Sequence, residues 1–289
     1  MITPLTMMQQ KREKTELVLK NIYNLPPIPK IMNEALKLLE NKSTSTSELY
    51  RIISKDQGIV SKILSISNSP KYGLQRRVTS IDFALSILGF TELKNIISVL
   101  SLTEAFKNKT DNYLDQKEFW LHSLLTGCAA KRLAEDLELA FIGGFLHDMG
   151  VSIMDKYFHT NFVQIHELIN KGFSLRDAEL EILGMDHQEI GNILSVRWNF
   201  PPELCNAILY HHQPSLANQD DKMLAAIIHF ADYMTHHLNL GQLRYDENFQ
   251  LDKECLSILQ LKNDEEMNYF IECYKELFNS QIEALRYLN

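Results

Sequence analysis

The sequence predicts an all-α protein. Apolar residues recur at helical spacing along the chain, and no run of alternating β-branched residues bounded by turns appears. The 289 residues are enough for one large domain or two smaller ones. A composition of 45% hydrophobic and 23% charged residues is that of an ordinary globular protein. We therefore expect an N-terminal helical layer packed on a second helical bundle.

Prolines and capping residues mark the first helices. After an N-terminal helix or extension, prolines forbid a helix interior until a helix begins near Lys30. Ser45 and Glu48 have the spacing of a capping box and start a short helix. Thr79, followed by Asp82, predicts a later helix that runs to Gly89.

The polar stretch 107–112 interrupts the helical periodicity and is the best candidate for a boundary. The helices that follow it carry most of the histidines of the chain. We therefore divide the chain into an extension, an N-terminal helical half, a histidine-bearing half and a C-terminal helical extension, with the boundaries 1–20, 21–110, 111–240 and 241–289.

Seven side chains suited to metal binding lie within the apolar helical stretches. They include five of the ten histidines and two aspartates, and no cysteine belongs to the set. Such donors favour iron, manganese, zinc or magnesium over a soft thiolate site. Taken singly, each histidine is more often a hydrogen-bonded residue than a ligand. The candidate ligands are His122, His147, Asp148, His187, His211, His212 and Asp232.

The local patterns place several of these residues. Gly143 and Gly144 precede the pair His147-Asp148 on one helical face and let another backbone come close. Adjacent helical residues diverge by about 100° around the axis, so this pair could meet at one ion only with suitable rotamers. A single helix therefore cannot complete the site.

The remaining candidates lie near helix ends or within one helix. Asp186 and Glu189 form an N-cap pair that places His187 in a first turn. His211 and His212 fall in the last turn of a helix that begins at Pro202. The helix that contains Asp232 also carries His229 and His236 at same-face spacing, and we expect these two histidines to support the ligands from behind.

Other functional classes find little support. The sequence contains no P-loop, no GxSxG elbow, no GxGxxG after a strand and no HExxH motif. A net charge of −8 disfavours nucleic-acid binding, and only Arg76-Arg77 suggests a basic patch. No apolar run approaches the ~20 residues of a membrane span, and no secretion signal is visible, so we expect a cytoplasmic protein.

The C-terminal segment from Asn263 to Leu288 carries a strong amphipathic stripe, with Asn263 and Glu266 as a capping pair. The stripe is expected to pack on the chain itself. A dimer or partner interface through this helix is the alternative.

Several motifs in order, LPPIP, ISKDQGIVSKILSISNSPKYG, TSIDFALSILGFTELKNII, FIGGFLHDMG, GMDHQEIGNIL and YHHQP, resemble those of the HDOD domain family. The resemblance covers roughly residues 17–215. It implies an all-helical bacterial signalling module, related to HD-type metal-dependent phosphohydrolases, that acts by regulation or scaffolding through a protein partner. His122, His147, Asp148 and Asp232 match the one-metal pattern of the HD enzymes. His187, His211 and His212 match the additional histidines of the two-metal HD-GYP domains.

Two departures weaken the catalytic interpretation. Val151 stands where an HD-GYP domain carries lysine, and no Gly-Tyr-Pro follows HHQP. We therefore expect a cytoplasmic regulator that binds an unidentified signalling partner and could hold a divalent metal. The alternative is a metal-dependent phosphohydrolase acting on a phosphoester or nucleotide, with Asp148 as the candidate catalytic residue.

Overall fold

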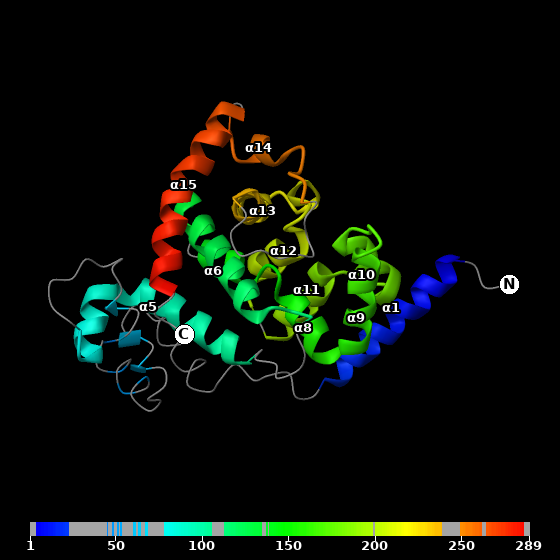
Figure 1. Cartoon of the computed structure of the whole chain (residues 1–289), viewed down its shortest axis with the longest axis horizontal. Coiled ribbons are helices and arrows are strands. Elements are labelled where there is room, and N and C mark those ends of the chain that lie inside the picture. Colours follow the sequence, from blue (N-terminus) through cyan, green and yellow to red (C-terminus); the bar gives the residue numbers. More distant parts are fainter. Residues whose placement is uncertain are drawn as a thin grey trace. The chain divides into compact units, whose positions relative to one another are not determined.

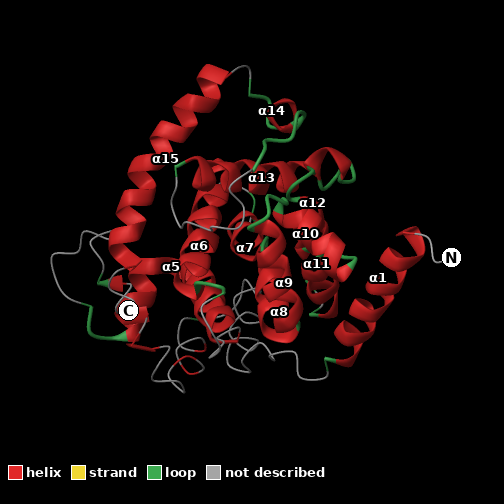
Figure 2. Cartoon of the chain, turned by 45° about the vertical axis from the view of Figure 1, so that its right-hand side comes forward, coloured by secondary structure: helices red, strands yellow, loops and turns green. Residues whose placement is uncertain are grey.

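In the computed structural model, all the regular secondary structure of the described residues is helical (Figures 1 and 2). These residues are joined by turns and loops and contain no strand, so the predicted all-α class is confirmed. The helix expected near Lys30 and the polar stretch 107–112 lie outside the described residues. The structure describes 4–22, 78–105, 113–134, 137, 139–198, 200–238, 249–261, 264–285 and single positions between 45 and 68.

The chain forms two compact units. Unit 1 contains Met1–Leu25 and Asn108–Glu272, and unit 2 contains Pro26–Lys107 and Cys273–Asn289. The division into four segments made from the sequence stays a prediction. All of the candidate ligands belong to unit 1.

The described part of unit 2 begins with the capping pair predicted from sequence. The Ser45 amide donates to the Glu48 carboxylate at 2.9 Å, and the Glu48 amide donates to the Ser45 hydroxyl at 3.3 Å. Helix α5 (Ile81–Ala105) follows and is kinked at Gly89, whose φ of 72° is left-handed. The Phe83 amide donates to the Ser80 hydroxyl, so Ser80 caps this helix rather than Thr79.

Unit 1 is built from short helices. In chain order they are α1 (Pro4–Asn21), α6 (Gln116–Leu133), α7 (Ala140–Leu146), α8 (Met149–Tyr157), α9 (His159–Ile169), α10 (Leu175–Leu183), α11 (His187–Arg197), α12 (Pro202–Tyr210), α13 (Lys222–His237) and α14 (Cys255–Ile258), with a 3-10 turn at Pro214–Leu216. The helix α15 (Asp264–Leu285) begins in unit 1 and ends in unit 2.

Helices α6, α7 and α13 pack together at the centre of unit 1. The first two approach backbone to backbone, because a Cβ atom on Gly144 would lie 2.8 Å from the Thr126 carbonyl oxygen. The hydroxyls of Thr126 and Thr235 lie 3.1 Å apart and link α6 to α13. These contacts fix the relative positions of three ligand-bearing elements.

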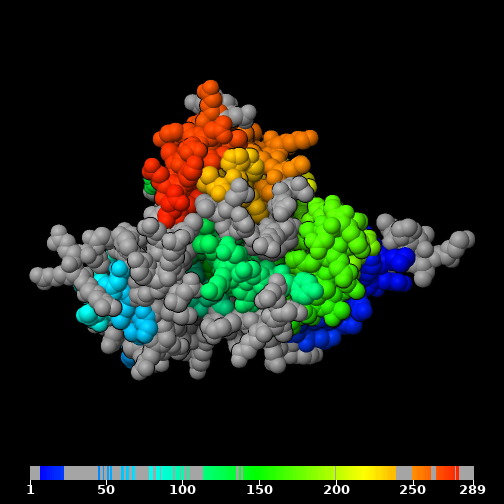
Figure 3. Space-filling model, in the orientation of Figure 1, coloured from blue at the N-terminus to red at the C-terminus, as the bar shows by residue number. Residues whose placement is uncertain are grey.

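Glycine also allows two further close approaches within unit 1. A Cβ atom on Gly150 would overlap the backbone of His187, so α8 and α11 meet without a side chain between them. Gly184 ends α10 with a left-handed φ of 68°, and the α1 backbone at Arg12 passes beside it. The Thr15 hydroxyl donates to the Leu183 carbonyl at 2.8 Å. Figure 3 shows α1 lying directly against α10.

The C-terminal helix α15 buries Ile271, Tyr274 and Phe278, while Tyr269 on the same helix is 67% exposed. The predicted stripe is thus partly covered within a single chain, and a dimer through α15 stays a prediction. The predicted cap at Asn263 lies outside the described residues. No described helix is long and apolar enough to cross a membrane.

Candidate metal centre

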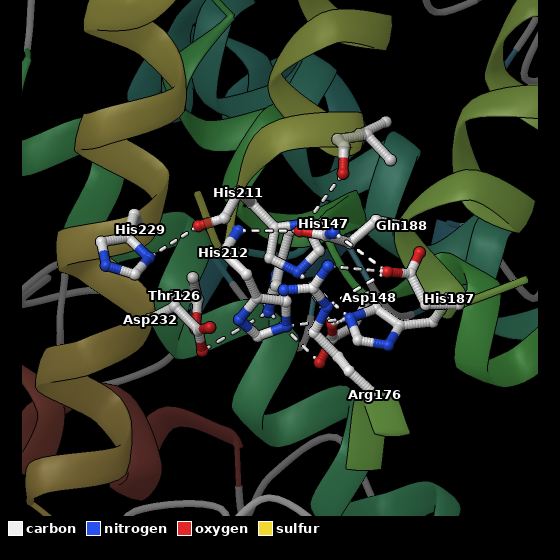
Figure 4. Close-up of polar contacts among 12 residues, drawn as sticks. Thr126, His147, Asp148, Arg176, His187, Gln188, His211, His212, His229 and Asp232 are labelled. Atoms are coloured by element: carbon white, nitrogen blue, oxygen red, sulfur yellow. Dashed lines mark hydrogen bonds and ion pairs between the residues drawn. The ribbon is translucent and has the colours of Figure 1, made fainter. Parts of the chain in front are cut away.

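The structure brings all seven predicted ligands together inside unit 1. Figure 4 labels all of them except His122. They come from α6, the turn between α7 and α8, the start of α11, the end of α12, and α13. His122, His147, His187 and His211 are fully buried, and His212 is partly exposed. The ligand atoms form three overlapping groups. Two are centred on the carboxylates of Asp148 and Asp232, and the third, formed by His122, His147 and Asp148, joins them.

The first group, which we call the Asp148 subsite, consists of Asp148, His187, His211 and His212. The Asp148 Oδ1 atom lies 3.5 Å from His187 Nε2 and 3.4 Å from His211 Nε2. His187 Nε2 lies 2.9 Å from His212 Nε2. Four potential ligand atoms thus lie within 4.8 Å of one another.

The second group, which we call the Asp232 subsite, consists of His122, Asp232 and His236. Asp232 Oδ1 lies 2.9 Å from His122 Nε2 and 3.5 Å from His236 Nε2. His147 lies between the subsites, with its Nε2 atom 3.3 Å from Asp148 Oδ2 and 3.5 Å from Asp232 Oδ1.

The adjacent pair His147-Asp148 reaches this position because it does not lie within a helix. His147 follows the last residue of α7, and Asp148 precedes the first residue of α8. The expectation of one continuous helix through the pair was therefore wrong. His147 Nε2 and Asp148 Oδ2 lie 3.3 Å apart, so the two side chains face the same centre.

Hydrogen bonds to the Nδ1 atoms fix the orientation of three rings. His147 Nδ1 donates to the Gly144 carbonyl at 2.7 Å, and His211 Nδ1 donates to the Ile208 carbonyl at 2.8 Å. His187 Nδ1 donates to the Glu179 carboxylate at 2.8 Å. In the neutral form of each ring, the Nε2 lone pair therefore points into the cluster. This arrangement of a ring held from behind by an oxygen is typical of metal-ligating histidines.

Burial and neighbouring charges shift the pKa values of the imidazoles in opposite directions, which divides them into two classes. Burial lowers the pKa of His211 and of His212, and it lowers the pKa of His236 to about 4. These rings are neutral at neutral pH, as ligands must be. Burial acts in the same direction on His147 and His187, but carboxylates outweigh it. Asp148 and Asp232 raise the pKa of His147 well above its usual value, and Glu179 raises the pKa of His187 to about 9.

The two aspartates are held ionised. Burial alone would raise their pKa values, but His147 and other nearby imidazoles lower the pKa of Asp148 and of Asp232 well below the usual range. Two carboxylates thus stay charged in a region from which water is almost excluded. Such a region favours a positive charge between them.

Glu179 is a functional residue that the sequence analysis missed. It is fully buried, and its carboxylate contacts both the backbone amide of His187 at 2.9 Å and the ring Nδ1. A signal was present, because Leu175, Glu179 and Leu183 lie four residues apart on the buried face of α10. An acid on such a face needs a buried partner.

A second set of contacts positions the start of α11 and the backbone of His212. Asp186 caps α11 as predicted, accepting from the Glu189 amide at 3.0 Å, and Arg176 donates to its other oxygen at 3.0 Å. Gln188 accepts from the His212 amide at 2.9 Å. These residues hold two ligands in place from outside the cluster.

The two histidines expected to support Asp232 play different parts. His229 Nδ1 donates to the His211 carbonyl at 2.7 Å, and its Nε2 accepts from the Asp252 amide at 2.7 Å. Both nitrogens are therefore used, and His229 positions His211. His236 instead faces Asp232 and His122. The ring of Phe249 lies over the outer side of the cluster, stacked on His236 at 5.2 Å and tilted against His212 at 5.3 Å.

The cluster fits a divalent metal on two independent grounds. The ring nitrogens of His122, Nε2 of His147 and Oδ1 of Asp232 are buried without a hydrogen-bond partner among the residues that the structure describes. The donor atoms are 2.9–3.5 Å apart. Ligands about 2.1 Å from one ion are separated by about 3.0–3.4 Å in octahedral or tetrahedral coordination.

Comparisons with known proteins agree with this architecture. An HDOD domain protein of unknown function from Geobacter sulfurreducens has a TM-score of 0.81 and 22% identity, over 96% of this chain and 98% of that chain. A Shewanella amazonensis SB2B protein, provisionally described as a phosphohydrolase, has a TM-score of 0.75 and 22% identity, over 94% of this chain and 98% of that chain. These likenesses show the shared fold.

An uncharacterized protein of Treponema pallidum (strain Nichols) is 23% identical over 267 residues, which cover 90% of this chain. The chain spans about half the length of that curated relative, 51% of it. The HDOD domain family itself matches residues 25–214, well over half of the chain. With the helical fold and the buried His/Asp cluster, this match establishes that the chain belongs to the HDOD domain family.

Proposed function

We propose that this protein is a cytoplasmic, metal-binding signalling regulator, which binds divalent cations in the His/Asp cluster and acts by contacting a partner protein. The observation that carries the proposal is the convergence of imidazole Nε2 atoms on two ionised carboxylates. The donor set is rich in imidazole, which favours zinc or iron over magnesium.

The burial of the cluster supports regulation over turnover. Four of the histidines are fully buried, and Asp148 is 6% exposed. Phe249 covers the two partly exposed rings, tilted against His212 and stacked on His236. A metal bound in a buried site stabilises the folded arrangement of the helices that carry its ligands. Metal loading would therefore change the stability of the surface that contacts a partner.

Phosphoester hydrolysis is the second candidate function. It is favoured by the combination of carboxylate and imidazole donors and by the fold shared with the Shewanella protein described provisionally as a phosphohydrolase. A divalent metal bound here would supply Lewis acidity and lower the pKa of water. This function would depend on Asp148, because its carboxylate is a potential ligand beside His187, His211 and His212 and also lies next to the His147 ring.

Metal analysis paired with a hydrolysis assay separates the two functions. The protein is stripped with a chelator, reloaded with Zn²⁺, Mn²⁺ or Fe²⁺, dialysed, and measured for bound metal and for turnover of nucleotide phosphodiesters. The regulator predicts bound metal without turnover. Metal-dependent turnover that Asp148→Asn abolishes would replace the regulator by the enzyme, and the absence of bound metal would overturn both.

A further inference from the structure

We infer that His236 is a metal ligand and completes a second cation site with His122 and Asp232, next to the site formed by Asp148, His187, His211 and His212. The inference rests on the proposed metal binding and deepens it. In the sequence, His236 is one of two histidines flanking Asp232 at same-face spacing, with no motif to distinguish it from His229.

The geometry of the Asp232 subsite distinguishes His236 from a supporting residue. Its Nε2 atom lies 3.5 Å from Asp232 Oδ1, the same oxygen that is 2.9 Å from His122 Nε2. The three ligand atoms all lie within 4.8 Å of one another. The rings of His122 and His236 are 4.8 Å apart at their centroids, with an interplanar angle of 57°.

His122 and Asp232 provide the independent evidence for a ligand. His122 is fully buried, and neither of its ring nitrogens has a hydrogen-bond partner among the described residues. Its approach of 2.9 Å to Asp232 Oδ1 is not aligned as a hydrogen bond. Leaving such groups unpaired in the interior is energetically unfavourable. A cation contacting all three residues would remove that cost.

The supporting structure makes this subsite rigid. Asp232 and His236 lie one turn apart on α13, and His122 faces them from α6. The Thr126–Thr235 contact links these two helices one turn beyond His122 and close to His236. A site built on two packed helices holds its ligands more accurately than one built on loops.

The adjacent residue His237 provides a matched control. It follows His236 on the same helix, but it is exposed and its ring stacks on Tyr233 at 5.7 Å. Substitution of His237 removes the same chemical group from the same helix turn without touching the cluster.

The test counts bound Zn²⁺ by mass spectrometry of metal content after dialysis, with far-UV circular dichroism to verify folding. We expect two ions per chain for the unmodified protein and for His237→Gln, and one for His236→Gln. His187→Gln, which alters the Asp148 subsite, should lose the other ion. The double variant His187→Gln/His236→Gln should retain none.

Three other outcomes would each overturn a different part of the proposal. Two ions in both the unmodified protein and folded His236→Gln would overturn the role of His236. One ion in both would overturn the second site and leave the proposed metal binding intact. No ion in the unmodified protein would overturn the proposed function itself. If His236→Gln does not fold, His122→Gln tests the same subsite, and retention of two ions there would overturn the inference.

Discussion

Glu179 is a buried residue outside the predicted ligand set that determines the chemical properties of one candidate ligand, His187. Its carboxylate accepts from both the backbone amide and the ring Nδ1 of His187, so it fixes the position and the tautomer of the imidazole. It also raises the pKa of His187 to about 9, against the effect of burial. A carboxylate in this position increases the electron density at Nε2 and hence its strength as a metal ligand.

The variant Glu179→Gln should weaken metal binding. The amide is nearly isosteric but carries no charge, and outer-sphere changes of this kind reduce metal affinity about 10–100-fold. Competition with a chromophoric chelator measures the change. Glu181→Gln is the control, because Glu181 lies on the exposed side of α10 and pairs with Lys11. Equal affinities in the two variants would contradict the role assigned to Glu179.

At the scale of elements, the close contact between α6 and α7 positions His122 relative to His147. A Cβ atom on Gly144 would lie 2.8 Å from the Thr126 carbonyl oxygen and 2.9 Å from the Gly127 Cα atom, so the neighbour there is backbone. The carbonyl of Gly144 also accepts the hydrogen bond from His147 Nδ1. One glycine therefore allows the helices to meet and orients a ligand.

We expect Gly144→Ala to destabilise unit 1 by about 1–3 kcal/mol, because the two helix backbones must separate. It should also weaken metal binding. Gly143→Ala is the matched control, since its added Cβ atom would meet the end of the flexible Ile228 side chain. That variant should cost less, because the end of a side chain can shift whereas a helix backbone cannot. The gain in helix propensity from glycine to alanine, about 1 kcal/mol, is common to both variants. Urea unfolding of the metal-free proteins compares them, and a smaller loss for Gly144→Ala would refute the packing argument.

At the scale of the whole molecule, the cluster links metal binding to the stability of one unit. Its ligands come from five separate parts of unit 1, so a bound ion holds together segments far apart in sequence. Unit 2 contributes none of these ligands. A ligand that binds only the folded state stabilises it according to its concentration relative to its dissociation constant.

Metal should therefore raise the melting temperature of unit 1 selectively. At one hundred times the dissociation constant the gain is about 2.7 kcal/mol, which corresponds to about 5–10 °C for a unit of this size. Calorimetry with and without a chelator should show one metal-dependent transition and one that does not move. Asp148→Asn, which removes a ligand of the Asp148 subsite, serves as the control and should reduce the shift. A single transition that moves as a whole would show that the units unfold together.

Local sequence patterns predicted much of the fold. The all-α class, the Ser45–Glu48 capping box and the Asp186 cap were predicted from spacings of three or four residues, and the structure confirms them. These features depend on contacts within one helical turn, which the sequence displays directly. The seven candidate ligands were also named from the sequence, because buried imidazoles and aspartates stand out in apolar helices.

Only the tertiary structure decided how those residues are used. His229 and His236 lie on the same face as Asp232, at helical spacings of three and four residues that the sequence cannot rank. His229 is occupied by the His211 carbonyl and the Asp252 amide, whereas His236 faces His122 across the α6–α13 contact. Spacing within a helix determines which residues share a face. The groups brought opposite that face by packing determine whether a histidine supports the backbone or faces the cluster.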